Sequence, residues 1–175
     1  MTREASDPIA AIGRAFLDES CRVLLSSYLP QIERCLERLS DEDVWWRPDE
    51  ASNSIGNLLL HLTGNLNQWI IGGVGSRPYD RDRQQEFDAR AHTPGRELVA
   101  RLKTVVEVAA EVIRSVDAGS LLGRRKIQSY DVSVLEAIYH VIEHFGVHTG
   151  QIIVLTKMRT GEDLKLWQPP KSEAR

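Results

Sequence analysis

Residues 139–151 read YHVIEHFGVHTGQ and hold three of the chain's five histidines, each four residues after the last. The flanking residues extend this segment into a run with the alternating 3,4 spacing of a helix that faces a bundle core. The positions of the run are Val134, Ala137, Val141, His144, His148, Gln151, Leu155 and Met158. The pattern predicts a core-facing helix whose apolar stripe is interrupted in its middle by polar side chains.

Helical periodicity recurs in three earlier segments and strict strand alternation is scarce, so we expect an all-α fold. The first helix should begin with Asp7 as N-cap and a proline at the first helical position. Pro30 is expected to kink this helix or divide it. The second helix should begin at the cap residue Ser54 and stop at Gly72-Gly73.

The last two helices have start signals of their own. A Thr-Pro pair at residues 93–94 should begin the third helix as the Asp-Pro pair begins the first. The fourth should begin at a capping box formed by Ser133 and Glu136 and end at Gly161. Residues 124–131, RRKIQSYD, are expected to be either a strand or an irregular loop.

The connection between the second and third helices, residues 74–92, is longer than bundle loops usually are. Such a length predicts a four-helix bundle with one long crossover, or a functional loop. The charged residues Arg81, Arg83 and Glu86 are read by default as solvated, and the alternative is that they bind an anion or orient a ligand. His92 is most simply a loop residue.

Length and composition favour one globular domain over residues 1–175, with a core from about residue 8 to 167 and a loose tail after Trp167. The net charge of −3, with acidic and basic residues interspersed, argues against a nucleic-acid partner. The chain shows neither an apolar leader segment nor a run of about 20 apolar residues, so no membrane association and a cytoplasmic location are expected.

The two cysteines, Cys21 and Cys35, lie in one helical pattern. A separation of fourteen residues corresponds to about 21 Å along a helix, which is too far for a disulfide. We expect reduced cysteines with a packing role, and the alternative is a functional thiol.

His144 and His148 lie one helical turn apart, a spacing at which two imidazoles can bind one metal ion. His140 continues the ladder, but each step of four residues rotates by about 40° around the helix, so one ion cannot readily use all three. His140 is therefore expected at the edge of the site, supporting a ligand or facing a substrate.

A third ligand is expected from the second helix, where His61 adjoins a polar strip that includes Asn65 and Gln68. If the second and fourth helices are neighbours, His61 completes a three-histidine site with open positions, as is typical of a catalytic metal. The alternative is that these histidines are buried polar residues satisfied by backbone carbonyls or by a neighbouring carboxylate such as Glu143.

The segments NSIGNLLLH (53–61) and HFGVHTGQ (144–151) resemble the DinB-like (DinB/YfiT-like) superfamily of metal-dependent four-helix-bundle proteins, in particular a bacterial branch of uncharacterised members. The resemblance covers nearly the whole chain. It implies an up-down-down-up bundle, frequent homodimers, and a divalent metal bound by His61, His144 and His148. Characterised relatives include transferases and isomerases that use low-molecular-weight thiols such as mycothiol, bacillithiol or glutathione.

The expected function is therefore that of a metal-dependent enzyme whose metal activates a small thiol or water to attack a small electrophilic substrate. Zn or Ni is the expected metal, with Fe, Mn or Co as alternatives. Gln151, Asn65 or Gln68 would orient the nucleophile, and His140 and Glu143 would carry protons. The alternatives are a metal-dependent hydrolase and a non-catalytic, stress-linked metal-binding module.

Overall fold

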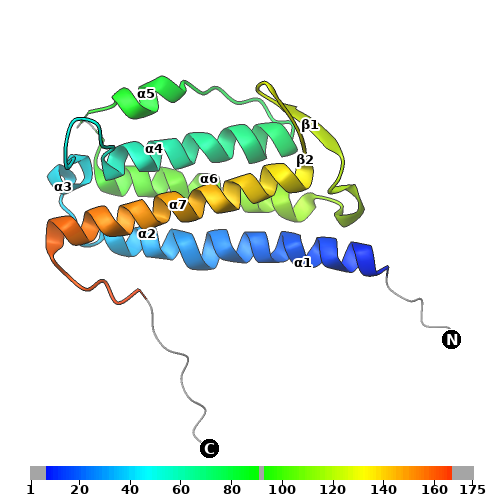
Figure 1. Ribbon diagram of the computed structural model, residues 1–175, viewed down its shortest axis with the longest axis horizontal. Helices are drawn as coiled ribbons and strands as arrows, with labels where there is room; N and C mark the ends of the chain where they lie inside the picture. The colour runs from blue at the N-terminus through cyan, green and yellow to red at the C-terminus, as the bar shows by residue number, and fades with distance from the viewer. Residues whose placement is uncertain (1–6, 91–92, 167–175) are drawn as a thin grey trace, which may run out of the picture.

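The computed structural model describes residues 7–90 and 93–166, and it is mostly helical (Figure 1). The assignments of His92 as a loop residue and of a tail after Trp167 lie outside these residues. The elements in chain order are α1 (Pro8–Val23), η1 (Leu24–Tyr28), α2 (Leu29–Leu36), α3 (Asp41–Trp45), α4 (Ile55–Leu66), η2 (Asn67–Val74), α5 (Arg83–Asp88), α6 (Gly95–Ser115), η3 (Ala118–Ser120), β1 (Arg124–Ile127), β2 (Tyr130–Ser133) and α7 (Val134–Thr160). Long helical rods formed by α1–η1–α2, α4–η2, α6 and α7 lie side by side.

The first rod begins as the sequence predicts, because the Asp7 carboxylate accepts a hydrogen bond from the backbone N–H of Ile9 at 3.0 Å. The division expected at Pro30 takes the form of a π-helical segment, η1, which separates α1 from α2. Proline has no N–H to donate to the preceding turn, and the wider π turn accommodates this loss within a rod that continues. Before α4 comes a short helix, α3, which was not expected from the sequence.

The second rod also begins as predicted, with Ser54 and Asn57 forming a capping box at the start of α4. The expected stop at Gly72-Gly73 is wrong, since the π-helical segment η2 continues through both glycines to Val74. A β-carbon at Gly73 would overlap the side chain of Ile127 in the hairpin. The glycine therefore allows the hairpin to approach the rod closely.

The third rod, α6, begins differently from the first. Pro94 is itself the N-cap, and no side chain at positions 93–94 caps the helix. Instead, the first N–H of the helix, that of Gly95, donates to the Asp41 carboxylate of α3 at 2.7 Å. The expectation that residues 93–94 act as the Asp-Pro pair does is therefore wrong, because the capping carboxylate comes from 54 residues away.

The strand alternative for residues 124–131 is confirmed, because β1 and β2 form an antiparallel hairpin. The hairpin leads directly into α7, whose predicted capping box of Ser133 and Glu136 is present. The predicted end of α7 is also confirmed, with Gly161 in the left-handed conformation at φ 68°.

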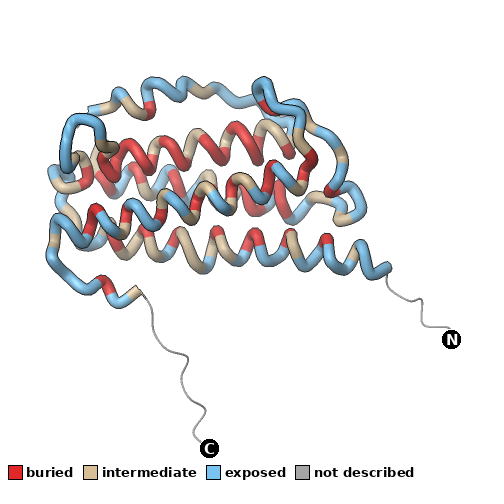
Figure 2. The backbone as a smooth tube through the Cα atoms, in the orientation of Figure 1, coloured by how far each residue is buried: buried red, intermediate tan, exposed pale blue. Residues whose placement is uncertain are grey.

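The core lies between the rods, and Figure 2 shows α4 buried along most of its length. Cys21 and Cys35 are both buried and free, and burial raises the pKa of each thiol. This confirms their expected packing role. Within the described part of the chain, none of the helices combines the length and the apolar character needed to cross a membrane.

The connection between η2 and α6 runs back over α4. Its helix α5 packs on α4 (Figure 1). Near the start of α4, the Asn57 amide donates to the carbonyl oxygens of Glu86 and Ala89, at 2.8 and 3.1 Å. The connection thus places charged side chains from residues 75–90 against the middle of the second rod.

Candidate metal centre

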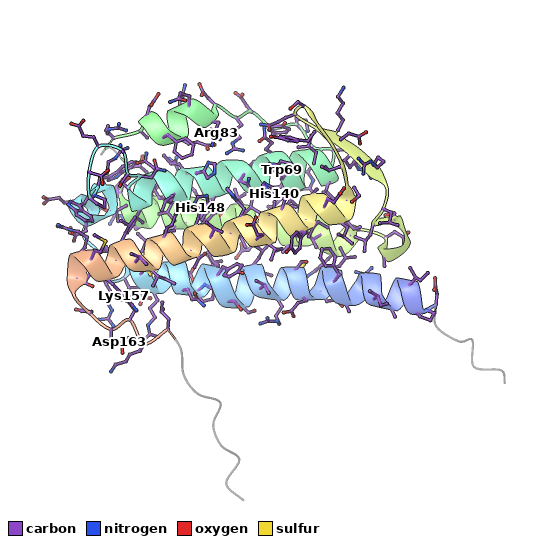
Figure 3. The ribbon with its side chains drawn as sticks, in the orientation of Figure 1. Trp69, Arg83, His140, His148, Lys157 and Asp163 are labelled. Carbon is purple, nitrogen blue, oxygen red and sulfur yellow. The ribbon has the colours of Figure 1, made fainter. Side chains whose placement is uncertain are left out.

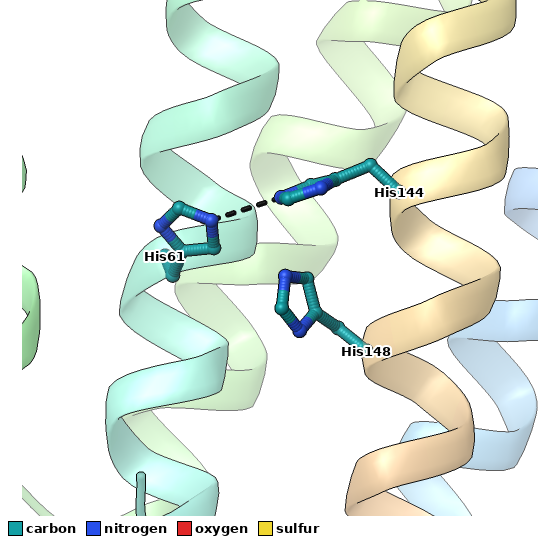
Figure 4. A group of neighbouring side chains, drawn as sticks. All are labelled: His61, His144 and His148. Carbon is teal, nitrogen blue, oxygen red and sulfur yellow. Dashed lines mark hydrogen bonds between the residues drawn. The ribbon is translucent and has the colours of Figure 1, made fainter.

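Three histidines from two rods converge at the middle of the bundle. His61 extends from α4, and His144 and His148 extend from α7 toward it (Figure 4). One nitrogen of each imidazole lies within 4.8 Å of the corresponding nitrogens of the other two. The structure therefore brings together the three residues that the sequence indicated as metal ligands.

The spacing of the imidazole nitrogens fits a single ion. The Nε2 atoms of His61 and His144 are 2.9 Å apart. Two nitrogens bound to one ion at about 2.0–2.1 Å, with an angle between about 90° and 110°, would be about 2.8–3.4 Å apart. The His61–His144 pair therefore already has the spacing of two ligands of one divalent ion.

Hydrogen bonds to two of the imidazoles direct their Nε2 atoms toward the centre. Nδ1 of His61 donates to Oε2 of Glu86 at 2.9 Å, and Nδ1 of His148 donates to Oε1 of Gln151 at 2.7 Å. When Nδ1 carries the proton, Nε2 of the neutral ring has a lone pair for a metal. Gln151, predicted to orient a nucleophile, thus contacts a ligand histidine.

Glu86 is held in place by a buried ion pair with Arg81. Arg81 donates through Nε to Oε1 at 2.7 Å and through Nη2 to Oε2 at 2.8 Å. Its third nitrogen, Nη1, donates to Oε1 of Gln68 at 2.7 Å. A β-carbon at Gly64 would overlap the Glu86 carboxylate, so the pair occupies space that only a glycine leaves.

The ionisation of these groups suits a metal. Burial, reinforced by His148, His61, His140 and Arg81, lowers the pKa of His144 to about 3. Burial also lowers the pKa of His148. Burial opposes ionisation of Glu86, but hydrogen bonds from Arg81 and His61 outweigh it and lower the pKa of its carboxyl. At neutral pH, His144 and His148 are therefore neutral, as metal ligation requires, and Glu86 is charged.

His140 and Glu143 lie outside the three-histidine cluster. The His140 ring centroid is 4.2 Å from that of Trp69 and 5.4 Å from that of His144. Glu143 is exposed, and its carboxylate makes no hydrogen bond to another described residue. The carboxylate that contacts a cluster histidine is Glu86 of the connection, and not Glu143.

A cavity of about 500 Å³ opens beside the cluster. His61 and His144 line one end of it, and Asn65, Trp69 and His140 line its walls. A second cavity, of about 630 Å³, is lined in part by Leu58 of α4 and Gln151 of α7. The first cavity leaves room for a small molecule beside His61 and His144.

The default expectation that Arg81 and Glu86 are solvated is wrong, because both side chains are buried in their ion pair. Only a weak signal in the sequence pointed to them. They occur in a polar segment, YDRDRQQEFD, in which six of ten residues are charged, and no spacing rule distinguishes one carboxylate there from another. Their role depends on the path of residues 75–90 over α4, which local pattern does not determine.

Comparisons with known proteins agree with this fold. A family model described as "Protein of unknown function (DUF1572)" matches residues 11–173. Among solved structures, a DinB-like protein from Bacillus cereus ATCC 10987 superposes with a TM-score of 0.63 at 16% identity, covering 79% of this chain and 89% of that one. No curated protein matches the chain. The expected DinB-like fold is confirmed.

Proposed function

The chain belongs to the DUF1572 family of proteins of unknown function, and we propose that it is a divalent-metal-dependent enzyme that transfers a small thiol, or water, to a small electrophilic substrate. The observation that carries this proposal is the cluster of His61, His144 and His148, which can hold a metal ion at the end of a cavity. Three imidazole ligands leave coordination positions open, as is typical of catalytic metals.

A bound divalent ion would lower the pKa of a thiol or water molecule and so supply a nucleophile at neutral pH. The protein's contribution is to hold His144 and His148 neutral by burial, and to orient the rings of His61 and His148 through the hydrogen bonds of their Nδ1 atoms to Glu86 and Gln151. Three imidazoles suit Zn or Ni, and Fe, Mn or Co are the alternatives.

His140 is proposed as the proton acceptor for the nucleophile, because it lines the same cavity and lies next to His144. Burial lowers its pKa, and the charge of Glu143 acts in the opposite direction. Glu143 would thus support the protonated form of His140 during turnover. Gln151 is proposed to keep the His148 ring oriented toward the other two imidazoles of the cluster.

The proposal extends to the topology of the helical bundle and to the partners of the chain. We propose an up-down-down-up four-helix bundle in one domain, because the connection over α4 returns to the end where α4 begins before α6 starts. A small-molecule substrate and a second copy of the chain are the proposed partners.

Metal analysis and a screen with defined substrates test the proposal. Untagged protein should contain about one divalent ion per chain by mass spectrometry of metals, and a His144→Ala, His148→Ala double variant should contain none. The metal-loaded parent should then conjugate glutathione to 1-chloro-2,4-dinitrobenzene, forming the sulfur–carbon bond as chloride leaves, or hydrolyse 4-nitrophenyl acetate without a thiol. A parent that takes up no Zn or Ni would overturn the proposal. A metal-bound parent that turns over neither substrate type in a wider screen would indicate a non-catalytic metal-binding module.

A further inference from the structure

The cavity beside the metal centre extends away from it along α4 and α7. His61 and His144 line one end, and Gln128 and Tyr130 of the hairpin line it elsewhere. Figure 3 shows Trp69 on the second rod and His140 on α7, and both side chains line this cavity. Its volume, about 500 Å³, is in the usual range for small-molecule sites.

The helical repeat orders the residues of this cavity by their distance from the metal centre. Asn65 follows His61 by four residues on α4, and His140 precedes His144 by four residues on α7. One turn of an α-helix rises about 5.4 Å. Asn65 and His140 therefore form the next layer of the cavity, one turn beyond the metal ligands.

The side-chain amide of Asn65 has unused hydrogen-bonding capacity. Asn65 is only 3% exposed, yet its Oδ1 has no hydrogen-bond partner among the described residues, and its Nδ2 donates to none of them. Gln68, the next polar residue along the strip, differs, since its Oε1 accepts from both Arg81 and Gln128. Buried amides are nearly always paired, so the Asn65 amide indicates a site for a ligand group.

An amide is the group that would satisfy Asn65 best. A side-chain amide offers one acceptor oxygen and two donor hydrogens, and a half-turn about its last bond exchanges their positions. A secondary amide on a ligand presents the complementary N–H and C=O.

The walls of the same layer are flat and aromatic. The Trp69 ring lies against His140, with centroids 4.2 Å apart, and its centroid is 5.9 Å from that of Tyr130. Trp69 is 8% exposed, so its ring is largely buried where it lines the cavity. Planar groups such as amides pack well on such surfaces.

We propose that this cavity is the substrate subsite and that it selects molecules carrying a secondary amide about one helical turn from the atom that faces the metal, with Asn65 pairing to that amide. The inference rests on the proposed function, because the reactive end of the ligand is placed at the metal. Asn65 thereby sets specificity, and the three histidines hold the metal.

Matched thiol probes test the subsite by binding. N-acetylcysteamine carries its amide nitrogen two carbons from the sulfur, and its N-methyl derivative has a methyl group in place of the amide hydrogen and so cannot donate. The metal-loaded full-length chain should bind the N–H probe roughly tenfold more tightly by calorimetry, the difference expected when one buried hydrogen bond is lost. In Asn65→Leu, both probes should bind with equal affinity.

A control variant and the metal content distinguish a failure of the amide subsite from a failure of the metal site. Thr149→Val removes the other side-chain oxygen that is buried and unpaired within residues 7–90 and 93–166; this oxygen lies outside the cavity lining, and the variant should keep the tenfold preference. Equal binding of both probes by the metal-loaded parent, binding of neither, or a preference that persists in Asn65→Leu would overturn the subsite and leave the metal-dependent function standing. A parent that takes up no metal would overturn both.

Discussion

His61 and Glu86 are 25 residues apart in the sequence, yet Nδ1 of the imidazole lies 2.9 Å from Oε2 of the carboxylate in a buried contact. This contact joins a helix of the bundle to the connection that crosses it. It fixes the ring orientation of one of the three clustered histidines, and it is in turn held by Arg81. Several consequences of this arrangement can be measured.

Removing the Glu86 carboxylate should weaken metal binding. We expect Glu86→Gln to lower the affinity for Zn by about 10- to 100-fold, as is typical when the carboxylate partner of a ligand histidine is lost. The affinity would be measured by competition with a chromogenic chelator. Asp88→Asn, which changes an exposed carboxylate of the same short helix, is the matched control and should bind as the parent does. Equal affinities in all three proteins would show that Glu86 does not support the site.

His140 should be dispensable for metal binding. Because its ring packs against Trp69 and His144 and lies outside the three-histidine cluster, we expect His140→Ala to retain about one ion per chain. His148→Ala should lose the ion under the same conditions. Loss of metal from His140→Ala alone would mean that the ladder on α7 binds the ion with a different set of ligands.

Substituting Gly64 should displace the Glu86–Arg81 pair, since a β-carbon there would overlap the carboxylate. Alanine in place of glycine within a helix normally stabilises by up to about 1 kcal/mol. At Gly64 we expect instead a net loss of about 1–3 kcal/mol from overpacking, together with weaker metal binding. Gly150→Ala, where nothing lies within 4 Å, should show the ordinary gain in urea unfolding. A gain at both positions would contradict the close approach of Glu86 to α4.

Metal removal should lower stability without unfolding the chain, because the core is formed by apolar residues that do not depend on the site. At a free metal concentration about 100 times the Kd, binding adds about 2.7 kcal/mol. For a chain of this size, that corresponds to a Tm higher by about 5–10 °C than in the chelator-treated protein. Helical circular dichroism should remain after chelation, and its collapse would show that the metal is required for folding.

The metal-free protein should lose stability as the pH falls. His144 takes up a proton near pH 6.5 when unfolded but only near pH 3 when folded, because burial lowers its pKa. Above pH 6.5 both states are neutral and the contribution is fully present. Between about pH 6.5 and 3 the unfolded state binds more protons, so the free energy of unfolding decreases. Urea titrations at pH 7 and pH 5 should show a smaller decrease in His144→Phe than in the parent. Identical decreases would exclude a lowered pKa at His144.

Local rules accounted for those parts of the fold whose causes lie within a few residues. The capping boxes at Ser54 and Ser133 and the glycine stop at Gly161 could be predicted because each satisfies backbone groups of its own helix. The start of α6 and the continuation of the second rod through Gly73 could not be predicted in this way. A carboxylate of α3 caps α6, and Gly73 serves the close approach of the hairpin. Both depend on contacts with residues distant in the sequence.

The sequence by itself determined the helical rods and the one-turn spacing of His144 and His148, because a helix places residues four apart on the same face. It also indicated His61 as the partner residue. Only the tertiary structure decided that Nε2 of His61 lies next to Nε2 of His144. It also decided that Glu86, held by Arg81, accepts a hydrogen bond from Nδ1 of His61. The physical reason is that periodicity fixes directions within one helix, whereas the approach of two rods and of the segment that crosses them depends on packing over the whole bundle.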